Sequence, residues 1–243
     1  MHKKKCLNCG RQIFDKYCAN CGQKTSTGRI TWHSLIKNDI LSSIWHLDTR
    51  FLDTTRDILF MPGRTAIDYI SGRRIRYYNF LSLLLILFSF NILGLHFYEK
   101  LASPQNLEEA PEIKNFFSEY SKAILFVIIP MLAVNTFFLF KKMKLNIAEH
   151  FIIGTVSLLG ILIIFLLNDI VSLIGLWEPV ANICDILDKA LFYSCILFPA
   201  VTYWNAFKNL YSKWGLLWRT AVLYALMAGE SLLFIKFYIE YLK

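Results

Sequence analysis

Residues 149–168 have the sequence EHFIIGTVSLLGILIIFLLN. After its first residue this stretch carries no Asp, Glu, Lys or Arg, and it consists mainly of Ile, Leu, Phe and small side chains. A helix of roughly 20 apolar residues is long enough to cross the hydrocarbon core of a bilayer. The stretch therefore predicts a membrane-spanning helix, and it decides the fold class of the whole chain.

Further stretches of the same kind lie on both sides of it. We expect five spans, at about 80–98, 122–140, 149–168, 187–207 and 216–238. The fourth is the weakest because Asp188 and Lys189 lie at its beginning, so the alternative that it does not cross stays open. The prediction is an all-α polytopic membrane protein with about five transmembrane helices, whose membrane domain covers residues 80–243.

The composition of the 243 residues agrees with this class. Only 18% of them are charged, 56% are hydrophobic, and the mean hydropathy is +0.43. Soluble domains have about 25% charged residues on average. An ordinary soluble globule, a disordered chain, a collagen-like chain and a secreted disulfide scaffold are therefore excluded.

The charge is distributed unevenly along the chain. Residues 1–79 contain 14 Lys and Arg against 6 Asp and Glu, whereas residues 80–243 contain 12 of each kind. The numbers of Lys and Arg in the connections between the predicted spans alternate low, high, low, high. By the positive-inside rule this pattern predicts a cytosolic N-terminus and, with five spans, a C-terminus outside. Nucleic-acid binding is the other usual explanation of a basic segment, and the spans that follow make it the less favoured one.

Two CxxCG motifs lie near the N-terminus, with cysteines at Cys6, Cys9, Cys18 and Cys21. Each pair places two thiolates on one tight turn, and four thiolates suit tetrahedral Zn²⁺. We predict zinc as the cofactor and these four cysteines as its ligands, in a small ribbon over residues 1–24. Iron in a rubredoxin-like site is the main rival, and a redox dithiol is less favoured because there are two matched pairs. A closed four-cysteine site has no open ligand position, so we expect a structural metal.

A polar linker over residues 25–30 leads to a cytosolic collar of amphipathic, interfacial helices over residues 31–79. The first helix has an apolar stripe at i+4 spacing, which consists of Trp32, Ile36, Ile40 and Ile44. We predict a second helix that begins at Asp48 and stops at Pro62-Gly63, and a third that follows Thr65 and ends at Gly72.

Arginines and tyrosines gather directly before the first predicted span. At a cytosolic interface, basic and aromatic residues anchor the chain and can hold an anionic headgroup. We therefore predict a lipid or interface site that consists of Arg73, Arg74, Arg76, Tyr77 and Tyr78. Plain anchoring without a bound lipid is the simpler explanation.

The same region carries a resemblance to a known family. Its motifs are, in order, the CxxCG pair, His46-Leu-Asp48, Pro62-Gly-Arg64, the segment from Tyr69 to Arg74, and Tyr78-Asn-Phe80 before the spans. In this order the chain resembles an uncharacterised bacterial family of zinc-ribbon polytopic membrane proteins, a domain of unknown function. The resemblance covers about residues 1–90 by motif, although Phe80 stands where family members often have proline. It implies a multi-pass protein of the bacterial inner membrane, and it implies no reaction.

Outside the cysteines, one residue inside the predicted spans is a candidate for a function. Glu230 lies midway along the fifth predicted span, and an ionisable residue at that depth points to a functional site. Its expected partner is Asn91 or Asn135, and a hydrogen bond that only holds neighbouring helices together is the more favoured of the two roles. His46 and Asp48 are weaker candidates for a metal or acid–base site, because a His beside an N-capping Asp is usually structural. No catalytic motif occurs, so we assign no enzymatic activity.

These features lead to one main functional hypothesis and two others. The main one is an integral membrane binding, scaffold or regulatory protein whose ribbon and collar engage a protein partner or an anionic lipid at the inner leaflet. The alternative is a small transporter or channel component that uses Glu230. A weaker third is a membrane-tethered regulator that binds nucleic acid through residues 1–79. The sequence does not specify a ligand or an oligomeric state.

Overall fold

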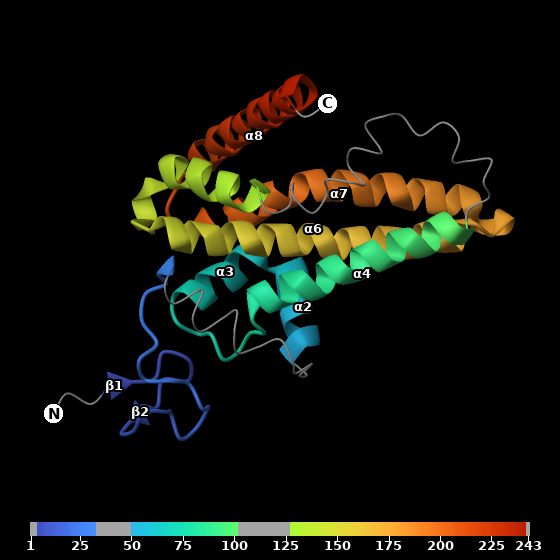
Figure 1. The fold of residues 1–243 in the computed structure, drawn as a ribbon. Coiled ribbons are helices and arrows are strands. Elements are labelled where there is room, and N and C mark those ends of the chain that lie inside the picture. Colours follow the sequence, from blue (N-terminus) through green and yellow to red (C-terminus); the bar gives the residue numbers. More distant parts are fainter. Residues whose placement is uncertain (1–3, 33–49, 102–126, 242–243) are drawn as a thin grey trace.

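The computed structural model describes residues 4–32, 50–101 and 127–241, and this part of the chain is almost wholly helical (Figure 1). A two-stranded antiparallel ribbon at the N-terminus joins β1 (Lys4–Lys5) to β2 (Gln12–Ile13). The helices are α2 (Arg50–Phe60), α3 (Pro62–Ile70), α4 (Phe80–Leu101), an unlabelled helix over Val127–Leu139, α6 (Ile147–Gly175), α7 (Ala181–Phe207) and α8 (Lys213–Tyr241). Two short 3-10 turns, η3 (Lys141–Met143) and η4 (Glu178–Val180), complete the described elements.

The central element is α6, which packs against α2, α3, α4 and α7. Its buried residues include Ile152, Ile153, Val156 and Leu159. The turn η4 reverses the chain so that α7 returns alongside α6 (Figure 1). The two helices approach closely at Gly160, where an added Cβ would lie only 1.9 Å from the ring of Phe198. A glycine at this position therefore lets the Phe198 ring lie directly on the α6 backbone.

The helices α2 and α3 form the collar, and both pack against α6. Prediction and structure differ here, because α3 begins at Pro62 and not after Thr65. Proline suits the first turn of a helix, where its missing N–H would have no partner. Thr65 is buried inside α3, and its hydroxyl donates to the Asp57 carbonyl of α2. The predicted terminator is confirmed, since Gly72 follows α3 with φ +103°.

Gly63 fixes the position of α3 on the bundle. An added Cβ at this residue would lie 2.2 Å from the Ala206 backbone nitrogen and 2.3 Å from the Thr202 carbonyl oxygen, both of α7. Only glycine permits such a contact between two backbones, because any side chain would collide with atoms that cannot rotate away. The Pro62-Gly63 pair thus ends α2 and also lets α3 pack closely against α7.

Among the described residues, three helices are long and apolar enough to cross a membrane, over Phe80–Tyr98, Ile147–Gly175 and Lys213–Leu233. Helices occur at all five predicted places, but two of them do not meet this description in the residues that the structure describes. Val127–Leu139 is a shorter apolar helix. The fourth predicted span lies in α7, which has Asp185, Asp188 and Lys189 in its first ten residues. The structure therefore supports a membrane protein with about three candidate spans.

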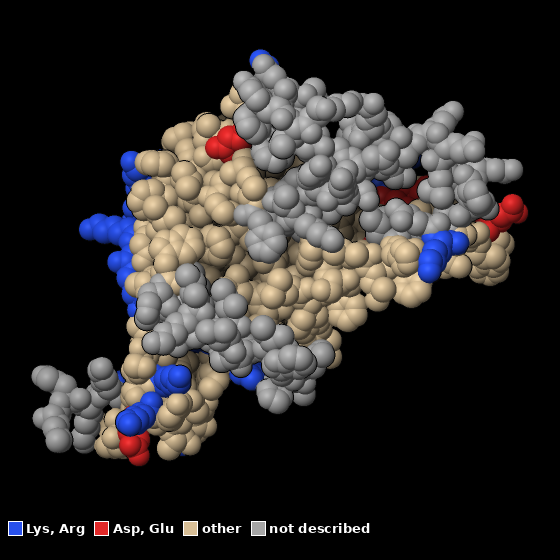
Figure 2. Space-filling view, viewed as in Figure 1, with Lys and Arg blue, Asp and Glu red and all other residues tan. Residues whose placement is uncertain are grey.

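One end of the bundle is basic. Exposed lysines lie on η3 and around the connection from α7 to α8, namely Lys141, Lys142, Lys144, Lys208 and Lys213. The two segments lie together, since the Lys142 ammonium donates to the Leu210 carbonyl and the Lys142 backbone N–H donates to the Tyr211 hydroxyl. Figure 2 shows Lys and Arg gathered along this end of the molecule, on the side of the ribbon.

Candidate metal centre

The two CxxCG motifs fold into matching turns. In the first, the Cys6 N–H donates to the Arg11 carbonyl and the Gly10 N–H donates back to Cys6. In the second, Cys18 and Gln23 pair in the same way, and the Gly22 N–H donates to Cys18. Gly10 and Gly22 have φ of 75° and 73°, a left-handed conformation that glycine adopts without steric cost. Each glycine thus lets its turn close beneath a pair of thiols.

The turns bring the four predicted ligands together. The Sγ atoms of Cys6, Cys9, Cys18 and Cys21 all lie within 4.8 Å of one another, and two pairs of them are 3.6 Å apart. In a tetrahedral site with metal–sulfur bonds of about 2.3 Å, neighbouring sulfurs are about 3.8 Å apart. The cluster therefore has the size and shape of a four-thiolate metal site. Among the described residues it is the one group of at least three His, Cys, Asp or Glu side chains placed in this way.

The environments of two of the thiols differ. The backbone amide of Arg11 lowers the pKa of Cys9 to about 6, which makes it a thiolate at neutral pH. Desolvation, together with the neighbouring thiols of Cys6 and Cys9, raises the pKa of Cys21 to about 11. Metal binding at neutral pH must therefore displace at least the Cys21 proton.

The ribbon packs against the turn that follows α3. The side-chain amide of Gln23, which is buried, donates to the Gly72 carbonyl over 2.7 Å. An added Cβ at Gly72 would lie 2.6 Å from Leu7 Cδ1, and one at Gly22 would lie 3.6 Å from Ile75 Cδ1. Residues of both CxxCG turns thus attach the four-cysteine cluster to the collar.

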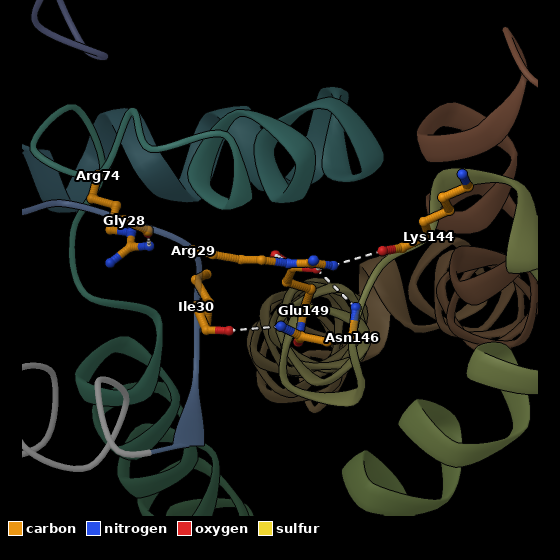
Figure 3. Close-up of polar contacts among 7 residues, drawn as sticks. All are labelled: Gly28, Arg29, Ile30, Arg74, Lys144, Asn146 and Glu149. Atoms are coloured by element: carbon orange, nitrogen blue, oxygen red, sulfur yellow. Dashed lines mark hydrogen bonds and ion pairs between the residues drawn. The ribbon is translucent and has the colours of Figure 1, made fainter. Parts of the chain in front are cut away.

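A second attachment joins the predicted linker to the start of α6, and Figure 3 shows its contacts. We call it the Arg29 clamp, and it consists of Gly28, Arg29, Ile30, Arg74, Lys144, Asn146 and Glu149. The Arg29 guanidinium donates to both carboxylate oxygens of Glu149, from Nε and Nη2, each over 2.8 Å. Nη2 also donates to the Lys144 carbonyl over 2.6 Å. The side chain of Glu149 is only 3% exposed, whereas that of Arg29 is 58% exposed. The hydrogen bonds from Arg29 to Glu149 raise the pKa of Arg29, which stays charged.

The first turn of α6 completes the clamp. The Asn146 side chain accepts from the Glu149 N–H, and the Glu149 carboxylate accepts from the Asn146 N–H, which is a capping box. The Asn146 amide also donates to the Ile30 carbonyl, and Arg74 donates to the Gly28 carbonyl. Ile30 is 1% exposed in the core. The predicted linker is therefore hydrogen-bonded both to the start of α6 and to Arg74.

The structure places the five predicted interface residues within the collar. Tyr77 and Tyr78 are buried. The Tyr77 hydroxyl donates to the Asp68 carboxylate, and the Tyr78 backbone N–H donates to the Thr54 hydroxyl. Burial, with the nearby Asp68 carboxylate, raises the pKa of Tyr77 to about 12. The three arginines have partners in the chain: Arg73 pairs with Asp68, Arg74 bonds to Gly28, and Arg76 pairs with Asp57. These residues thus hold the collar together, and a role toward lipid stays a prediction.

Glu230 has one of its two expected partners. The Asn135 side-chain amide donates to Glu230 Oε2 over 2.8 Å and so joins the helix over Val127–Leu139 to α8. Asn91 instead donates to the carbonyls of Leu87 and Leu162, which joins α4 to α6. The other weak candidates, His46 and Asp48, lie outside the described residues.

Sequence reasoning missed the Arg29 clamp, although one signal for it was present. Asn146 and Glu149 have the three-residue spacing of a capping box directly before an apolar run. That spacing could have shown where α6 begins. Nothing local to Arg29 indicates that it pairs with a carboxylate 120 residues away.

Comparison with known proteins adds a family model and no function. The model of a family described as "Protein of unknown function (DUF3667)" matches residues 48–91. The matched stretch contains α2, α3, the turn at Gly72 and the first half of α4, and thus the collar that carries the ribbon. No curated protein and no solved structure matches the chain.

Proposed function

We propose that the protein is a membrane-embedded scaffold that presents a metal-bound ribbon to a protein partner. The observation that carries this proposal is that the ribbon is attached through Gln23 to Gly72, and the linker that follows it through Arg29 to Glu149. A ribbon that served only as a loose tether would need no such contacts. Fixed attachment to a candidate membrane helix is what a presenting surface requires.

The exposed surface of the ribbon fits a protein partner. Phe14 is 83% exposed and Tyr17 is 53% exposed. Exposed aromatic side chains on a rigid support are the usual anchors of protein interfaces. Arg73, Arg74 and Arg76 are engaged with Asp68, Gly28 and Asp57, respectively, which leaves these three less available to lipid headgroups. We therefore favour a protein over a lipid as the partner of this surface.

Zinc is the metal that we propose for the four-cysteine cluster. Zinc has no geometric preference of its own and accepts four thiolates in a closed tetrahedral site. Iron would give the same geometry with a visible absorption band. We further propose that the basic end of the bundle faces the cytosol of a bacterial cell, because Lys and Arg are enriched on that side of membrane proteins.

A photocrosslinking side chain at Phe14 tests the scaffold proposal in intact membranes. We expect a discrete crosslinked product between the protein and one partner. The product should be lost in a Cys9→Ser variant, which removes a ligand, and in an Arg29→Met variant, which releases the clamp. A Cys184→Ser variant is the matched control, because Cys184 is a buried cysteine of α7 outside the cluster.

Two results would overturn the proposal. One is the absence of any discrete product at both Phe14 and Tyr17. The other is a product that persists unchanged in the Cys9 and Arg29 variants. Elemental analysis of the purified chain tests the metal separately, and less than about half a zinc per chain would contradict the zinc assignment.

One observation favours a second candidate, a small transporter or channel component. Glu230 and Asn135 form a hydrogen-bonded pair between two apolar helices, and ionisable residues in such surroundings are costly unless they serve a purpose. If the carboxyl group carries or gates an ion or proton, Glu230→Gln should abolish flux in reconstituted vesicles. If the pair is only glue, Glu230→Gln keeps the hydrogen bond and flux stays unchanged, which would reject this candidate.

A further inference from the structure

A hollow of about 330 Å³ lies between α6 and α7 at the end of the bundle away from the ribbon. Six residues line it: Phe165, Asn168, Asp188, Lys189, Phe192 and Tyr193. Its volume is in the range of small-molecule sites. Aromatic rings form one part of the wall, and an amide, a carboxylate and an ammonium form the rest. None of these residues belongs to the metal cluster or the Arg29 clamp.

The position of the hollow along α6 relates it to the bilayer. From Ile147 to Asn168 the helix advances by 21 residues, which at 1.5 Å each is about 32 Å. The hydrocarbon core of a bilayer is about 30 Å thick. If α6 enters the membrane at its basic end, the hollow lies at the level of the headgroups of the opposite leaflet.

The charged groups of the hollow are of both signs. Asp188 Oδ2 lies 3.2 Å from the Ser172 hydroxyl, which donates to it. Asp188 Oδ1 is buried and has no hydrogen-bond partner among the described residues. Lys189 is the next residue and is exposed. Asp169, which follows Asn168 on α6, faces α4, because an added Cβ at Gly94 would lie 2.8 Å from Asp169 Oδ2.

The Asp188 side chain lines the hollow and the residue is only partly buried, so its carboxylate can accept from a donor that occupies the hollow. A primary ammonium supplies N–H donors, whereas a quaternary ammonium has none. The rings of Phe165, Phe192 and Tyr193 would favour any cation beside them. The Lys189 ammonium and the Asn168 amide are donors suited to the oxygens of a phosphate.

We propose that this hollow binds the headgroup of a zwitterionic phospholipid of the phosphoethanolamine class. The lipid ammonium donates to Asp188, and the phosphate accepts from Lys189 and Asn168. The acyl chains run along the exposed aromatic and aliphatic surface of α6 and α7. The site is independent of the ribbon and of its proposed partner.

Lipid retention by the full chain tests the proposal. The delipidated protein is placed in nanodiscs of equal parts phosphatidylethanolamine, phosphatidylcholine and phosphatidylglycerol, released into mild detergent, and analysed by native mass spectrometry. We expect phosphatidylethanolamine to be enriched about tenfold over the other two, which is what one charge-assisted hydrogen bond of about 1.4 kcal/mol provides.

Two variants and one control test whether the enrichment of phosphatidylethanolamine depends on residues of the hollow. Asp188→Asn should remove the enrichment, and Lys189→Gln should lower retention of the same lipid. Asp185→Asn is the matched control, because Asp185 is an exposed carboxylate of α7 that does not line the hollow. Lys189 is exposed, so its variant keeps the test valid if the Asp188 variant fails to fold.

Several results would overturn the proposal. Equal retention of the three lipids would do so, as would enrichment that survives both Asp188→Asn and Lys189→Gln. Retention of phosphatidylcholine equal to that of phosphatidylethanolamine would show that N–H donors are not selected. Full displacement of the lipid by soluble phosphoethanolamine would show that the site serves a soluble zwitterion and not a lipid.

Discussion

Glu149 is a carboxylate with almost no exposed surface at the start of α6, the most apolar of the described candidate spans. A buried charge is tolerated only when its oxygens are paired and hydrogen-bonded. Here Oε1 accepts from Arg29 Nε, while Oε2 accepts from Arg29 Nη2 and from the Asn146 backbone. One residue thus both caps α6 and holds the chain that descends from the ribbon.

The two tasks of Glu149 can be separated by substitution. Glutamine can keep the capping box through its one oxygen, but its NH2 group cannot accept from Arg29, so Glu149→Gln should remove the ionic part and one hydrogen bond of the pair and lower the free energy of unfolding by about 1–3 kcal/mol. Glu149→Ala removes both tasks and should cost about 1 kcal/mol more. Unfolding in mixed detergent, followed by circular dichroism, measures both. A cycle with Arg29→Met that shows no coupling between positions 29 and 149 would contradict the role of the clamp.

The metal affinity of the ribbon should depend on pH. Cys9, with a pKa of about 6, is already ionised at pH 7, whereas Cys21, with a pKa of about 11, still holds a proton that the metal must displace. Affinity should therefore rise with pH, by up to about tenfold per pH unit for each displaced proton. Below pH 6 the Cys9 proton is displaced as well, and the dependence should steepen. Competition with a chromophoric chelator between pH 5.5 and 8, on the full chain, measures this, and a flat profile would contradict it.

At the residue scale, the sequence predicts a site correctly where the spacing of neighbouring residues alone determines its geometry. Two CxxCG turns specify their own geometry, so the four cysteines could be assigned to one cluster before any fold was known. Tyr77 and Tyr78 were predicted as interface anchors because of their place before a span, yet they lie inside the collar. Burial depends on α2 and α3 folding back over them, which local spacing does not show.

At the scale of elements, backbone contacts at glycine control how the helices meet. Gly63 brings α3 against the backbone of α7, and Gly160 receives the ring of Phe198 on α6. The first contact has no flexible partner, since the atoms opposite are main-chain nitrogen and oxygen. The second is opposed by a side chain that can shift.

Alanine substitutions should rank these contacts. Gly63→Ala should destabilise the protein by about 3 kcal/mol or more, because overpacking against rigid atoms forces whole helices apart. Gly160→Ala should cost less, about 1–3 kcal/mol, since the Phe198 ring can move. Gly229→Ala is the control, because nothing lies within 4 Å of its added Cβ, and helix propensity favours alanine there by up to about 1 kcal/mol. Melting temperatures in one detergent measure all three, and an unchanged Gly63→Ala variant would contradict the packing argument.

The helices themselves were largely predictable from the sequence, and their beginnings less so. Apolar runs mark helices at all five expected places, because a membrane helix needs a long apolar stretch whatever its neighbours are. The start of α3 was misplaced, since Pro62-Gly63 has the same sequence signature whether it ends one helix or begins the next. Whether α7 crosses the membrane could not be decided, because its apolar residues share the helix with Asp185, Asp188 and Lys189.

At the scale of the whole molecule, the ribbon and the bundle depend on different forces. The described ribbon has two short strands and a few buried residues, so a bound metal would supply most of what holds it folded. The bundle has its own core around α6. The Arg29 clamp belongs to the bundle side, since its partners lie on α6 and on the turn before α4.

Removal of the metal should therefore unfold the ribbon and spare the helices. With a strong chelator we expect trypsin to cleave after Arg11 and Lys16, while the helical signal in circular dichroism stays within about 5% of its starting value. Cleavage after Arg29 should stay slow as long as the clamp holds. Zinc added back should restore protection at Arg11 and Lys16. Loss of helical signal together with ribbon cleavage would show that the two parts fold as one unit.

The 120 residues between Arg29 and Glu149 also set an order of events during synthesis. The ribbon leaves the ribosome first, while its carboxylate partner does not yet exist. At about 5–20 residues per second, the gap is roughly 6–24 seconds. During that interval the ribbon can load its metal without being attached to α6. Closure of the clamp then marks the moment at which the start of the central helix has emerged, so a nascent chain truncated before Glu149 would carry a ribbon with only its collar to hold it.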